Sequence, residues 1–333
     1  MLKQTILLAL ALCIVLALPL SNTATGKTLR FAIIPKAENN TFYLPAKQGC
    51  MDAAKELGDV QCIYEGPETA DPRLQDSIIS RLIDEGIDGL AVAVIHSEFI
   101  ENRSIAKARN AGIPVVTFDS DFSQQTLARS KDIRSTYIGT DNYEFGQKLG
   151  TLVLKYRPDG GTLCIISGHK SAPGLNDRMR GVRKALAASA SGKWKEYERC
   201  PLFCRDDPNM ALEQLLYIFD TGTQDKNKVD TIIILGAWPQ QNPDDYRTSM
   251  TNRLATLESK QVLVIVGDSL DSQLQLLKQG LAHGNVGQVP YDMGKKAVET
   301  LYKIHHGEFV PDVVYTPSRI CFPENTSGIT IND

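Results

Sequence analysis

The sequence has no excess of charge of either sign. Its 36 Lys and Arg residues nearly balance its 39 Asp and Glu residues, and the formal net charge is −3 at pH 7. Charge-driven binding of nucleic acid needs a basic patch, and capture of an acidic partner needs a polybasic run. The sequence has neither, so we expect no nucleic-acid partner.

The common catalytic and metal-binding motifs are also missing. There is no G-x-S-x-G elbow, no Walker loop and no G-x-G-x-x-G after a strand. The pair of cysteines in CPLFC, residues 200–204, has no second cysteine or histidine pair at the spacing of a zinc site. We therefore expect a protein that is not an enzyme and that needs no metal or cofactor.

Long apolar runs are rare, and the exception lies near the N-terminus. Lys3 precedes the run ILLALALCIVLALPL, and the small and polar residues SNTATG follow it. This pattern is typical of a secretory signal peptide, with cleavage expected after Ala24. A retained membrane anchor is the alternative, but the run is shorter than the ~20 residues that span a bilayer. Leu12 is too bulky for the position before a lipid-attachment cysteine, so Cys13 does not indicate a lipoprotein.

Six cysteines follow the predicted signal peptide: Cys50, Cys62, Cys164, Cys200, Cys204 and Cys321. An exported protein can form disulfides, and six cysteines allow about 15 pairings. Cys50 and Cys62 are a plausible pair, because one is expected on a helix and the other on the next strand. Cys200 and Cys204 could pair with each other or with Cys164, and buried free thiols are the alternative for several of them.

The rest of the chain alternates short apolar runs with helical patterns, and this alternation occurs twice. The first set has expected strands at 29–35, 60–65, 88–94 and 113–119, with helices at 44–58, 71–86 and 97–112. The second set has strands at 161–168, 194–203, 229–237 and 261–269, with helices at 176–189, 208–222 and around 246–259. Unbroken apolar strands that are each followed by a helix predict a parallel sheet covered on both faces. We therefore expect an α/β protein with two similar lobes.

Polar and aromatic residues collect after the expected strands, where open parallel sheets bind ligands. Aromatic rings can cover the apolar faces of a sugar, and carboxylates, amides or arginine can bond its hydroxyls. The candidate ligand-binding residues are Asn40, Phe42, Tyr43, Asp119, Arg178, Phe203, Trp238, Asp268 and Gln288. Asp119 and Asp268 could instead be the carboxylate pair of a secreted glycoside-processing enzyme, which is the alternative from another class.

From residue 27 to 325 the chain resembles type I periplasmic sugar-binding proteins, most closely the ribose-binding group that serves ABC transporters. The shared segments include NNTFYLPAKQG, AGIPVVTFDSD, YIGTDNYEFGQKLG, VIVGDS and GQVPYDMGKKAV. The resemblance implies two Rossmann-like lobes joined by a three-strand hinge, and it matches eight of the nine candidate residues, all except Trp238, to a ligand contact.

Two departures from the ribose-binding pattern bear on the ligand. Ribose binders have an arginine directly after the aspartate of strand four, where this chain has Ser120 and then Asp121. They have an asparagine-aspartate pair where this chain has Ala237 and Trp238. We therefore expect a different pentose, a hexose or a related polyol.

The resemblance also implies the domain boundaries and the partners. Lobe 1 would hold residues 27–140 and 289–318, and lobe 2 would hold 141–288 and 319–333. The protein would be a periplasmic monomer that delivers a monosaccharide to an ABC transporter permease. Alternatively, its closed form would dock on a chemoreceptor or a histidine kinase and report the ligand.

Overall fold

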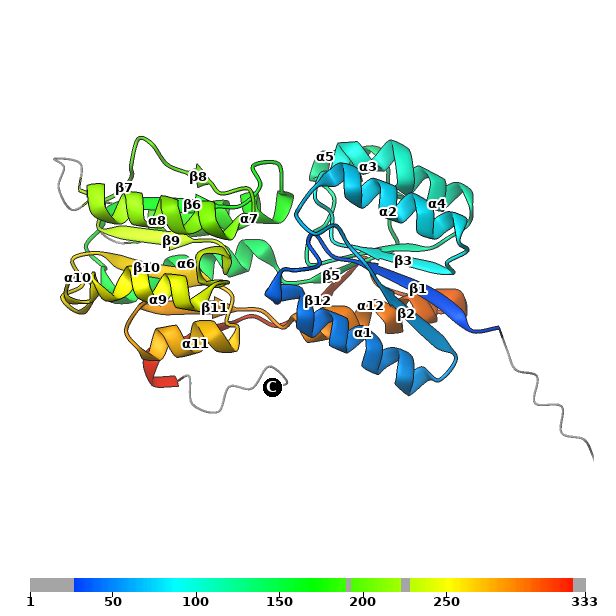
Figure 1. Cartoon of the computed structure of the whole chain (residues 1–333). Helices are drawn as coiled ribbons and strands as arrows, with labels where there is room; N and C mark the ends of the chain where they lie inside the picture. The colour runs from blue at the N-terminus through cyan, green and yellow to red at the C-terminus, as the bar shows by residue number, and fades with distance from the viewer. Residues whose placement is uncertain (1–26, 190–192, 223–227, 326–333) are drawn as a thin grey trace, which may run out of the picture.

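A computed structural model describes residues 27–189, 193–222 and 228–325. The predicted signal peptide, residues 1–26, lies outside the described residues. The described chain folds into two α/β lobes that lie side by side, each built around one sheet (Figure 1). The expected fold class is therefore confirmed.

Lobe 1 contains a parallel sheet with the strand order β12-β5-β4-β3-β1-β2. These strands are β1 (Leu29–Ile34), β2 (Val60–Tyr64), β3 (Gly89–Val92), β4 (Val115–Phe118), β5 (Tyr137–Gly139) and β12 (Val313–Tyr315). One face packs against α1 (Leu44–Leu57) and α12 (Pro290–His305), and the other against α2 (Pro72–Asp84), α3 (Ser97–Ile100) and α4 (Ala106–Asn110). A short helix, α5 (Gln124–Arg129), follows β4.

Lobe 2 contains a second sheet with the strand order β13-β11-β10-β9-β6-β7, and β8 also pairs with β6. Its strands are β6 (Gly161–Ser167), β7 (Trp194–Glu196), β8 (Leu202–Phe203), β9 (Thr231–Ile234), β10 (Leu263–Gly267), β11 (Gly284–Gly287) and β13 (Arg319–Cys321). Only β13 among these described strands runs antiparallel to its neighbour. The helices are α6 (Asn142–Tyr156), α7 (Pro173–Ala187), α8 (Pro208–Gly222), α9 (Pro243–Thr251), α10 (Leu254–Glu258) and α11 (Asp271–Lys278).

Three expected elements are interrupted. The strand expected over 194–203 is two strands, because a turn from Tyr197 to Cys200 intervenes and Pro201 has no N–H for the ladder. The helix expected over 97–112 breaks at Arg103, whose φ and ψ of −122° and −109° are not helical. The helix around 246–259 is divided into α9 and α10.

Three segments connect the lobes. The chain passes from β5 to α6, from β11 to α12 and from β12 to β13, and in each case the two elements belong to different lobes. Lys148 of α6 donates hydrogen bonds to the carbonyl and the hydroxyl of Ser318 in the third segment. The exact lobe boundaries stay a prediction, which this sheet membership supports.

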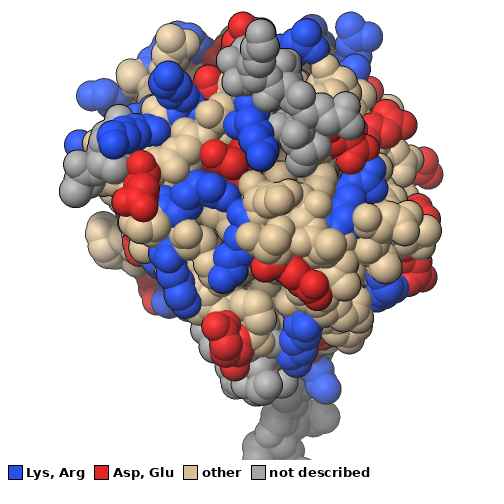
Figure 2. All heavy atoms as spheres, turned by 90° about the vertical axis from the view of Figure 1, so that its left-hand side faces the viewer, with Lys and Arg blue, Asp and Glu red and all other residues tan. Residues whose placement is uncertain are grey.

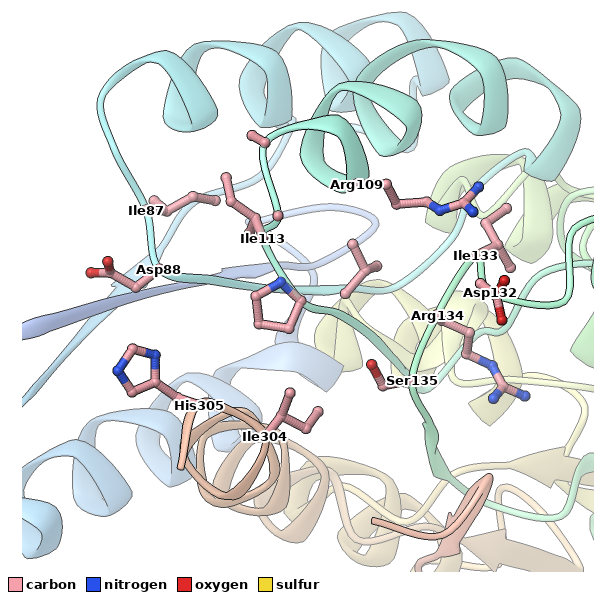
Figure 3. Close-up of a pocket in the computed structure, with 14 residues that line it drawn as sticks. Ile87, Asp88, Arg109, Ile113, Asp132, Ile133, Arg134, Ser135, Ile304 and His305 are labelled. Carbon is pink, nitrogen blue, oxygen red and sulfur yellow. The ribbon is translucent and has the colours of Figure 1, made fainter. Parts of the chain in front are cut away.

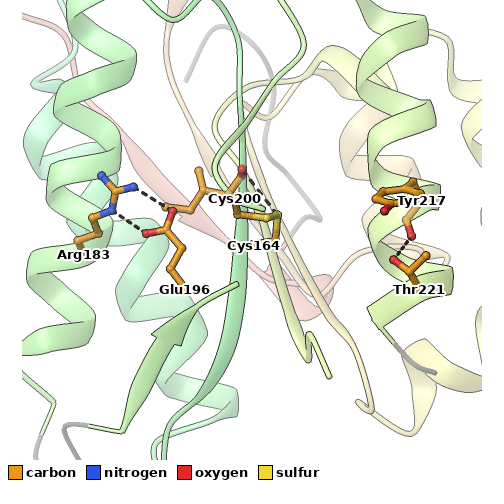
Figure 4. Close-up of a disulfide and its surroundings, with 7 residues drawn as sticks. Cys164, Arg183, Glu196, Cys200, Tyr217 and Thr221 are labelled. Atoms are coloured by element: carbon orange, nitrogen blue, oxygen red, sulfur yellow. Dashed lines mark hydrogen bonds and ion pairs between the residues drawn. A yellow bond between two sulfur atoms is a disulfide. The ribbon is translucent and has the colours of Figure 1, made fainter. Parts of the chain in front are cut away.

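Each lobe contains a disulfide. Cys50 of α1 is bonded to Cys62 of β2, and Cys164 of β6 is bonded to Cys200 (Figure 4). Beside the second disulfide, Arg183 of α7 makes two hydrogen bonds of 2.9 Å to Glu196 of β7. Cys204 and Cys321 are buried free thiols. Of the pairings left open by the sequence, Cys200 therefore takes Cys164 rather than Cys204.

The outer surface agrees with the balanced composition. On the end of lobe 2 that faces away from lobe 1, basic and acidic side chains are interspersed (Figure 2). Among the residues that the structure describes, no helix is long and apolar enough to cross a membrane.

The two lobes repeat one helix-packing device, in which two helices meet at glycines. In lobe 1, a Cβ atom on Gly49 would lie 2.1 Å from the carbonyl oxygen of Tyr291, and one on Gly294 would lie 1.9 Å from that of Ala46. In lobe 2, Gly146 and Gly181 form the equivalent contact between α6 and α7. The repetition supports a duplicated lobe, and it leaves no room for a side chain at these positions.

We predict that Gly294→Ala lowers the free energy of unfolding by about 1–3 kcal/mol, because the added methyl group must push backbone atoms apart. Urea denaturation followed by circular dichroism would measure this change. Lys296→Ala, on the same helix, is the control and should unfold like the parent protein. Equal stability of Gly294→Ala and the parent would show that α1 and α12 are not tightly packed.

Candidate ligand-binding cleft

A small cavity lies between the lobes, at the carboxyl ends of both sets of parallel strands. Its volume, as space for the centres of water molecules, is about 50 Å³. Adding the ~1.4 Å radius of a water molecule on every side gives a space roughly the size of one sugar ring. Eight of the nine candidate residues line it: Asn40, Phe42, Tyr43, Asp119, Arg178, Trp238, Asp268 and Gln288.

The first loop of lobe 1 supplies three of these residues because Asn40 forces a turn. The Asn40 side chain accepts a hydrogen bond of 2.9 Å from the backbone N–H of Phe42 and so caps the single 3-10 turn η1 (Thr41–Tyr43). Helix α1 starts immediately afterwards, with Pro45 in its first turn. The rings of Phe42 and Tyr43 meet edge to face, with centroids 5.0 Å apart, and both are buried.

Asp119 is held at the end of β4 by two tyrosines. The hydroxyl of Tyr43 donates a hydrogen bond of 2.6 Å to Asp119 Oδ2, and that of Tyr137 donates one of 3.1 Å to the Asp119 carbonyl. Burial, and then the nearby Asp119 carboxylate, raise the pKa of Tyr43 well above its usual value, so this hydroxyl keeps its proton. Asp119 Oδ1 has no partner among the described residues and is open to a ligand.

Asp268 occupies the corresponding position in lobe 2, after β10. Both aspartates adopt the left-handed backbone conformation, with φ of 57° at Asp119 and 70° at Asp268, which is unusual for residues other than glycine. The Asp268 carboxylate accepts hydrogen bonds from the Ala237 N–H at 2.9 Å and from Gln288 Nε2 at 2.7 Å. Burial raises its pKa, and the Arg178 guanidinium offsets only part of that effect.

Arg178 is fixed by two hydrogen bonds and by one aromatic ring. Its Nη1 donates a hydrogen bond of 2.7 Å to the Leu235 carbonyl, and its Nε donates one of 2.8 Å to Asn142 Oδ1. The guanidinium lies 4.1 Å from the centre of the Phe145 ring, a cation–π contact. Its Nη2 has no partner in the described part of the chain, so one rigid donor remains available in the cavity.

Trp238 forms an apolar wall of the cavity. It starts the short helix η3 (Trp238–Gln240), and its side chain is only 7% exposed. A Cβ atom would lie 2.7 Å from the indole at Gly168 and 3.0 Å from it at Gly236. Gly168 and Gly236 therefore leave space for the Trp238 ring. The ribose-binding pattern has no tryptophan at this position.

Phe203 does not line the cavity, contrary to expectation. It lies in β8, partly buried, with its ring 5.8 Å from Lys170 Nζ, and its carbonyl accepts a hydrogen bond from Gln214. Asp206, three residues further along, is the lining residue from this part of lobe 2.

The sequence reasoning missed Lys36, Asp206 and Gln241, which also line the cavity. All three follow a strand or a turn at the end of a strand, so their position in the sequence was compatible with a ligand contact. Their residue types, however, do not distinguish them from neighbouring loop residues.

The segment after Asp119, where ribose binders have an arginine, is directed away from the cavity through Asp121. Arg134 binds the Asp121 carboxylate through Nε and Nη2 at 2.8 Å each, and it also bonds Asp312 at 2.7 Å. This buried arginine joins the segment after β4 to the start of β12, and neither Asp121 nor Arg134 reaches the cavity. The position after Asp119 therefore offers the ligand no guanidinium.

A second hollow, of about 600 Å³, lies at the opposite, amino ends of the lobe 1 strands (Figure 3). Asp88, Arg109, Asp132 and Arg134 contribute its charged groups, and His305 adds an imidazole. Asp88 is paired with Lys27 at 2.7 Å, and Arg134 with Asp121 and Asp312. All of its lining residues belong to lobe 1, so this hollow does not lie between the lobes.

A protein-family model described as a periplasmic binding protein domain matches residues 31–308 of the chain. The chain belongs to the periplasmic binding protein family. The expectation of a binding protein rather than an enzyme is thereby confirmed.

Two curated relatives of this periplasmic binding protein illustrate the similarity. It is 23% identical to the ribose import binding protein RbsB of Escherichia coli over 301 residues, which cover 89% of this chain and 93% of RbsB. It is 26% identical to the D-allose-binding periplasmic protein of Escherichia coli over 173 residues, or 52% of this chain. That second match spans only 55% of the relative's length.

Solved structures show the same two-lobed fold. An ABC transporter solute-binding protein from Burkholderia graminis, in complex with D-arabinose, is 27% identical with a TM-score of 0.76, covering 91% of this chain and 98% of the other. A structure entitled XylFII-LytSN complex is 21% identical with a TM-score of 0.74, covering 90% and 99%.

We predict that Asp268→Asn raises the free energy of unfolding of the ligand-free protein near neutral pH. The pKa of Asp268 is raised in the folded state, so ionisation costs stability as the pH rises above the usual aspartate pKa of about 3.9. The asparagine cannot ionise, and its amide could donate to Gln288 Oε1, which has no partner in the described structure.

Urea unfolding at about pH 7 and about pH 4 would test this, and the gain should shrink at the lower pH. Asp132→Asn, at an exposed position, is the control. A variant that is less stable than the parent by the same amount at both pH values would contradict the prediction.

Proposed function

We propose that this protein captures a monosaccharide between its lobes and delivers it to an ABC transporter permease. The observation that carries the proposal is the set of lining residues from both lobes, with aromatic walls and polar groups that lack partners. A ligand that contacts both lobes stabilises the closed arrangement, and closure is a hinge motion at the three connecting segments.

The unpaired groups of the cavity match a polyhydroxylated ligand. The donors are Asn40 Nδ2 and Arg178 Nη2, and the acceptors are Asp119 Oδ1 and Gln288 Oε1, none of which has a partner among the described residues. A hydroxyl both donates and accepts, so a sugar can satisfy both the donors and the acceptors. Phe42, Tyr43 and Trp238 supply apolar surface for its ring faces.

The charges of the cavity favour a neutral ligand. Three carboxylates, from Asp119, Asp206 and Asp268, lie there with two cations, from Lys36 and Arg178. An anionic ligand such as a sugar phosphate would lose more by repulsion from the carboxylates than the two cations return. A neutral sugar or polyol has no such cost.

The ligand is proposed to be a pentose other than ribose, a hexose or a related polyol. The named relatives bind ribose, D-allose and D-arabinose, which supports the class without choosing a member. Two contacts of the ribose-binding pattern are replaced in this chain. Trp238 stands in the position of the asparagine-aspartate pair, and Asp121, which is bound to Arg134, does not line the cavity. The predicted signal peptide and the names of the relatives support a periplasmic location, and we propose a monomer.

A sensory role is the second candidate, and one observation favours it. The structural relative XylFII is found in a complex with LytSN. In that role the closed form of this protein would dock on a receptor or kinase rather than on a permease. The cleft chemistry would be the same in both roles.

A thermal-shift screen against ribose, arabinose, xylose, allose, galactose, fucose and glycerol tests the proposed function. A ligand at 100 times its dissociation constant stabilises the fold by about 2.7 kcal/mol, which gives a visible shift. We predict that at least one pentose or hexose produces such a shift. No shift with any sugar or polyol would overturn the proposal.

We predict that Asp119→Ala and Asp268→Ala each weaken binding of that sugar by about 10- to 100-fold, because each leaves hydroxyls unpaired in a buried site. Titration calorimetry would measure the dissociation constants. Trp238→Ala should also lower the affinity, and Asp132→Ala, on the surface of lobe 1, is the matched control. Unchanged affinity in both aspartate variants would reject the assignment of the site.

A further inference from the structure

A larger groove at the mouth of the cleft adjoins the cavity. The groove has a volume of about 640 Å³ and shares Ala37, Asn40, Ala70, Asp206 and Gln241 with the cavity. Lobe 1 contributes the loop from Glu68 to Pro72 to its walls, and lobe 2 contributes the loop from Arg205 to Pro208. The two spaces therefore adjoin each other at these five residues.

The junction between cavity and groove is narrow but not sealed by large side chains. Ala37 and Ala70 carry only methyl groups there. Across the junction, Gln241 Nε2 of lobe 2 donates a hydrogen bond of 2.8 Å to Asn40 Oδ1 of lobe 1. Both amides can exchange this bond for one to a ligand hydroxyl at little cost.

Asp206 is built into the junction by an unusual backbone. Arg205 and Asp206 both adopt left-handed conformations, with φ of 58° and 62°. Hydrogen bonds from the N–H groups of Cys204 and Arg205 to the end of β6, and from the His169 N–H to Asp206 Oδ1, fix the loop. Strained residues of this kind cluster at functional sites. Asp206 Oδ2 has no partner within the described structure.

The groove walls combine polar and apolar surface in nearly equal parts. Glu68 and Arg205 are exposed, and the structure shows neither a hydrogen bond nor an ion pair for either side chain among the described residues. His169, Asn39, Thr69 and Asp207 add further polar groups, and the apolar ones are Ala37, Ala70, Pro72, Pro208 and Met210. Such a mixed surface suits a sugar, which has hydroxyls around its edge and C–H groups on its faces.

We infer that the groove is a second subsite, which takes the second sugar unit of a disaccharide whose first unit fills the cavity. This inference rests on the proposed function, because it assumes that the cavity holds a sugar. Asp206 and Gln241 contact the region of the linkage, and Glu68 and Arg205 contact the outer unit.

Titration calorimetry of the full mature protein tests the inference. The probes are the monosaccharide found by the screen and disaccharides in which that monosaccharide is joined to glucose through each of its hydroxyls. We expect at least one disaccharide to bind about tenfold more tightly than the monosaccharide.

Thr69→Trp places a large side chain in the groove and leaves the cavity lining untouched, with Thr69→Ser as the control. Thr69→Trp should remove the gain of the disaccharide and leave the monosaccharide affinity within about twofold. Glu68→Ala, at another exposed groove position, should reduce only the disaccharide affinity.

If every disaccharide binds more weakly than the monosaccharide, the groove is only the open mouth of the cleft and the inference is wrong while the proposed function stands. Equal losses for both ligands in Thr69→Trp and Glu68→Ala would also overturn it. If neither kind of sugar binds, the proposed function itself fails.

Discussion

Two buried carboxylates, Asp119 after β4 in lobe 1 and Asp268 after β10 in lobe 2, constrain the rest of the cleft. A buried charge is tolerated only where it is hydrogen-bonded or paired. Asp119 is satisfied by the Tyr43 hydroxyl, and Asp268 by Gln288 and the Ala237 N–H. Asp119 therefore holds the first loop in place. Asp268 holds the turn before Trp238 and the connecting segment that contains Gln288.

This arrangement explains why the candidate ligand contacts come from both lobes. Each carboxylate is held by its own lobe or by the hinge, and the shared space between them contains donors and acceptors that have no partner among the residues that the structure describes. A small hydroxyl-rich molecule that fills the space would pair these groups at once. The hydrogen bond between the Asn40 and Gln241 side chains also crosses the cleft. Under the proposed function, a ligand that contacts both lobes would stabilise the closed form more than this one contact does.

Much of this could be predicted from the sequence, for identifiable reasons. Apolar strands that end in Asp119 and Asp268, with helices between them, place these residues at one edge of each sheet whatever the loop details. Phe203 lies outside the cavity, and no periodicity reveals the turn from Tyr197 to Cys200 that divides the strand before it. Asp206 was missed because its position depends on two consecutive left-handed residues. The partner of Asp121 was unpredictable, since Arg134 lies in a loop and is oriented by Asp312.

The most direct test of the account is a crystal structure of the protein with the sugar that stabilises it. The account predicts a single sugar ring between the first loop and Trp238, within hydrogen-bonding distance of Asp119 on one side and of Arg178 or Asp268 on the other. A sugar that contacts the residues of one lobe only, with the carboxylate of the other lobe turned away, would contradict it.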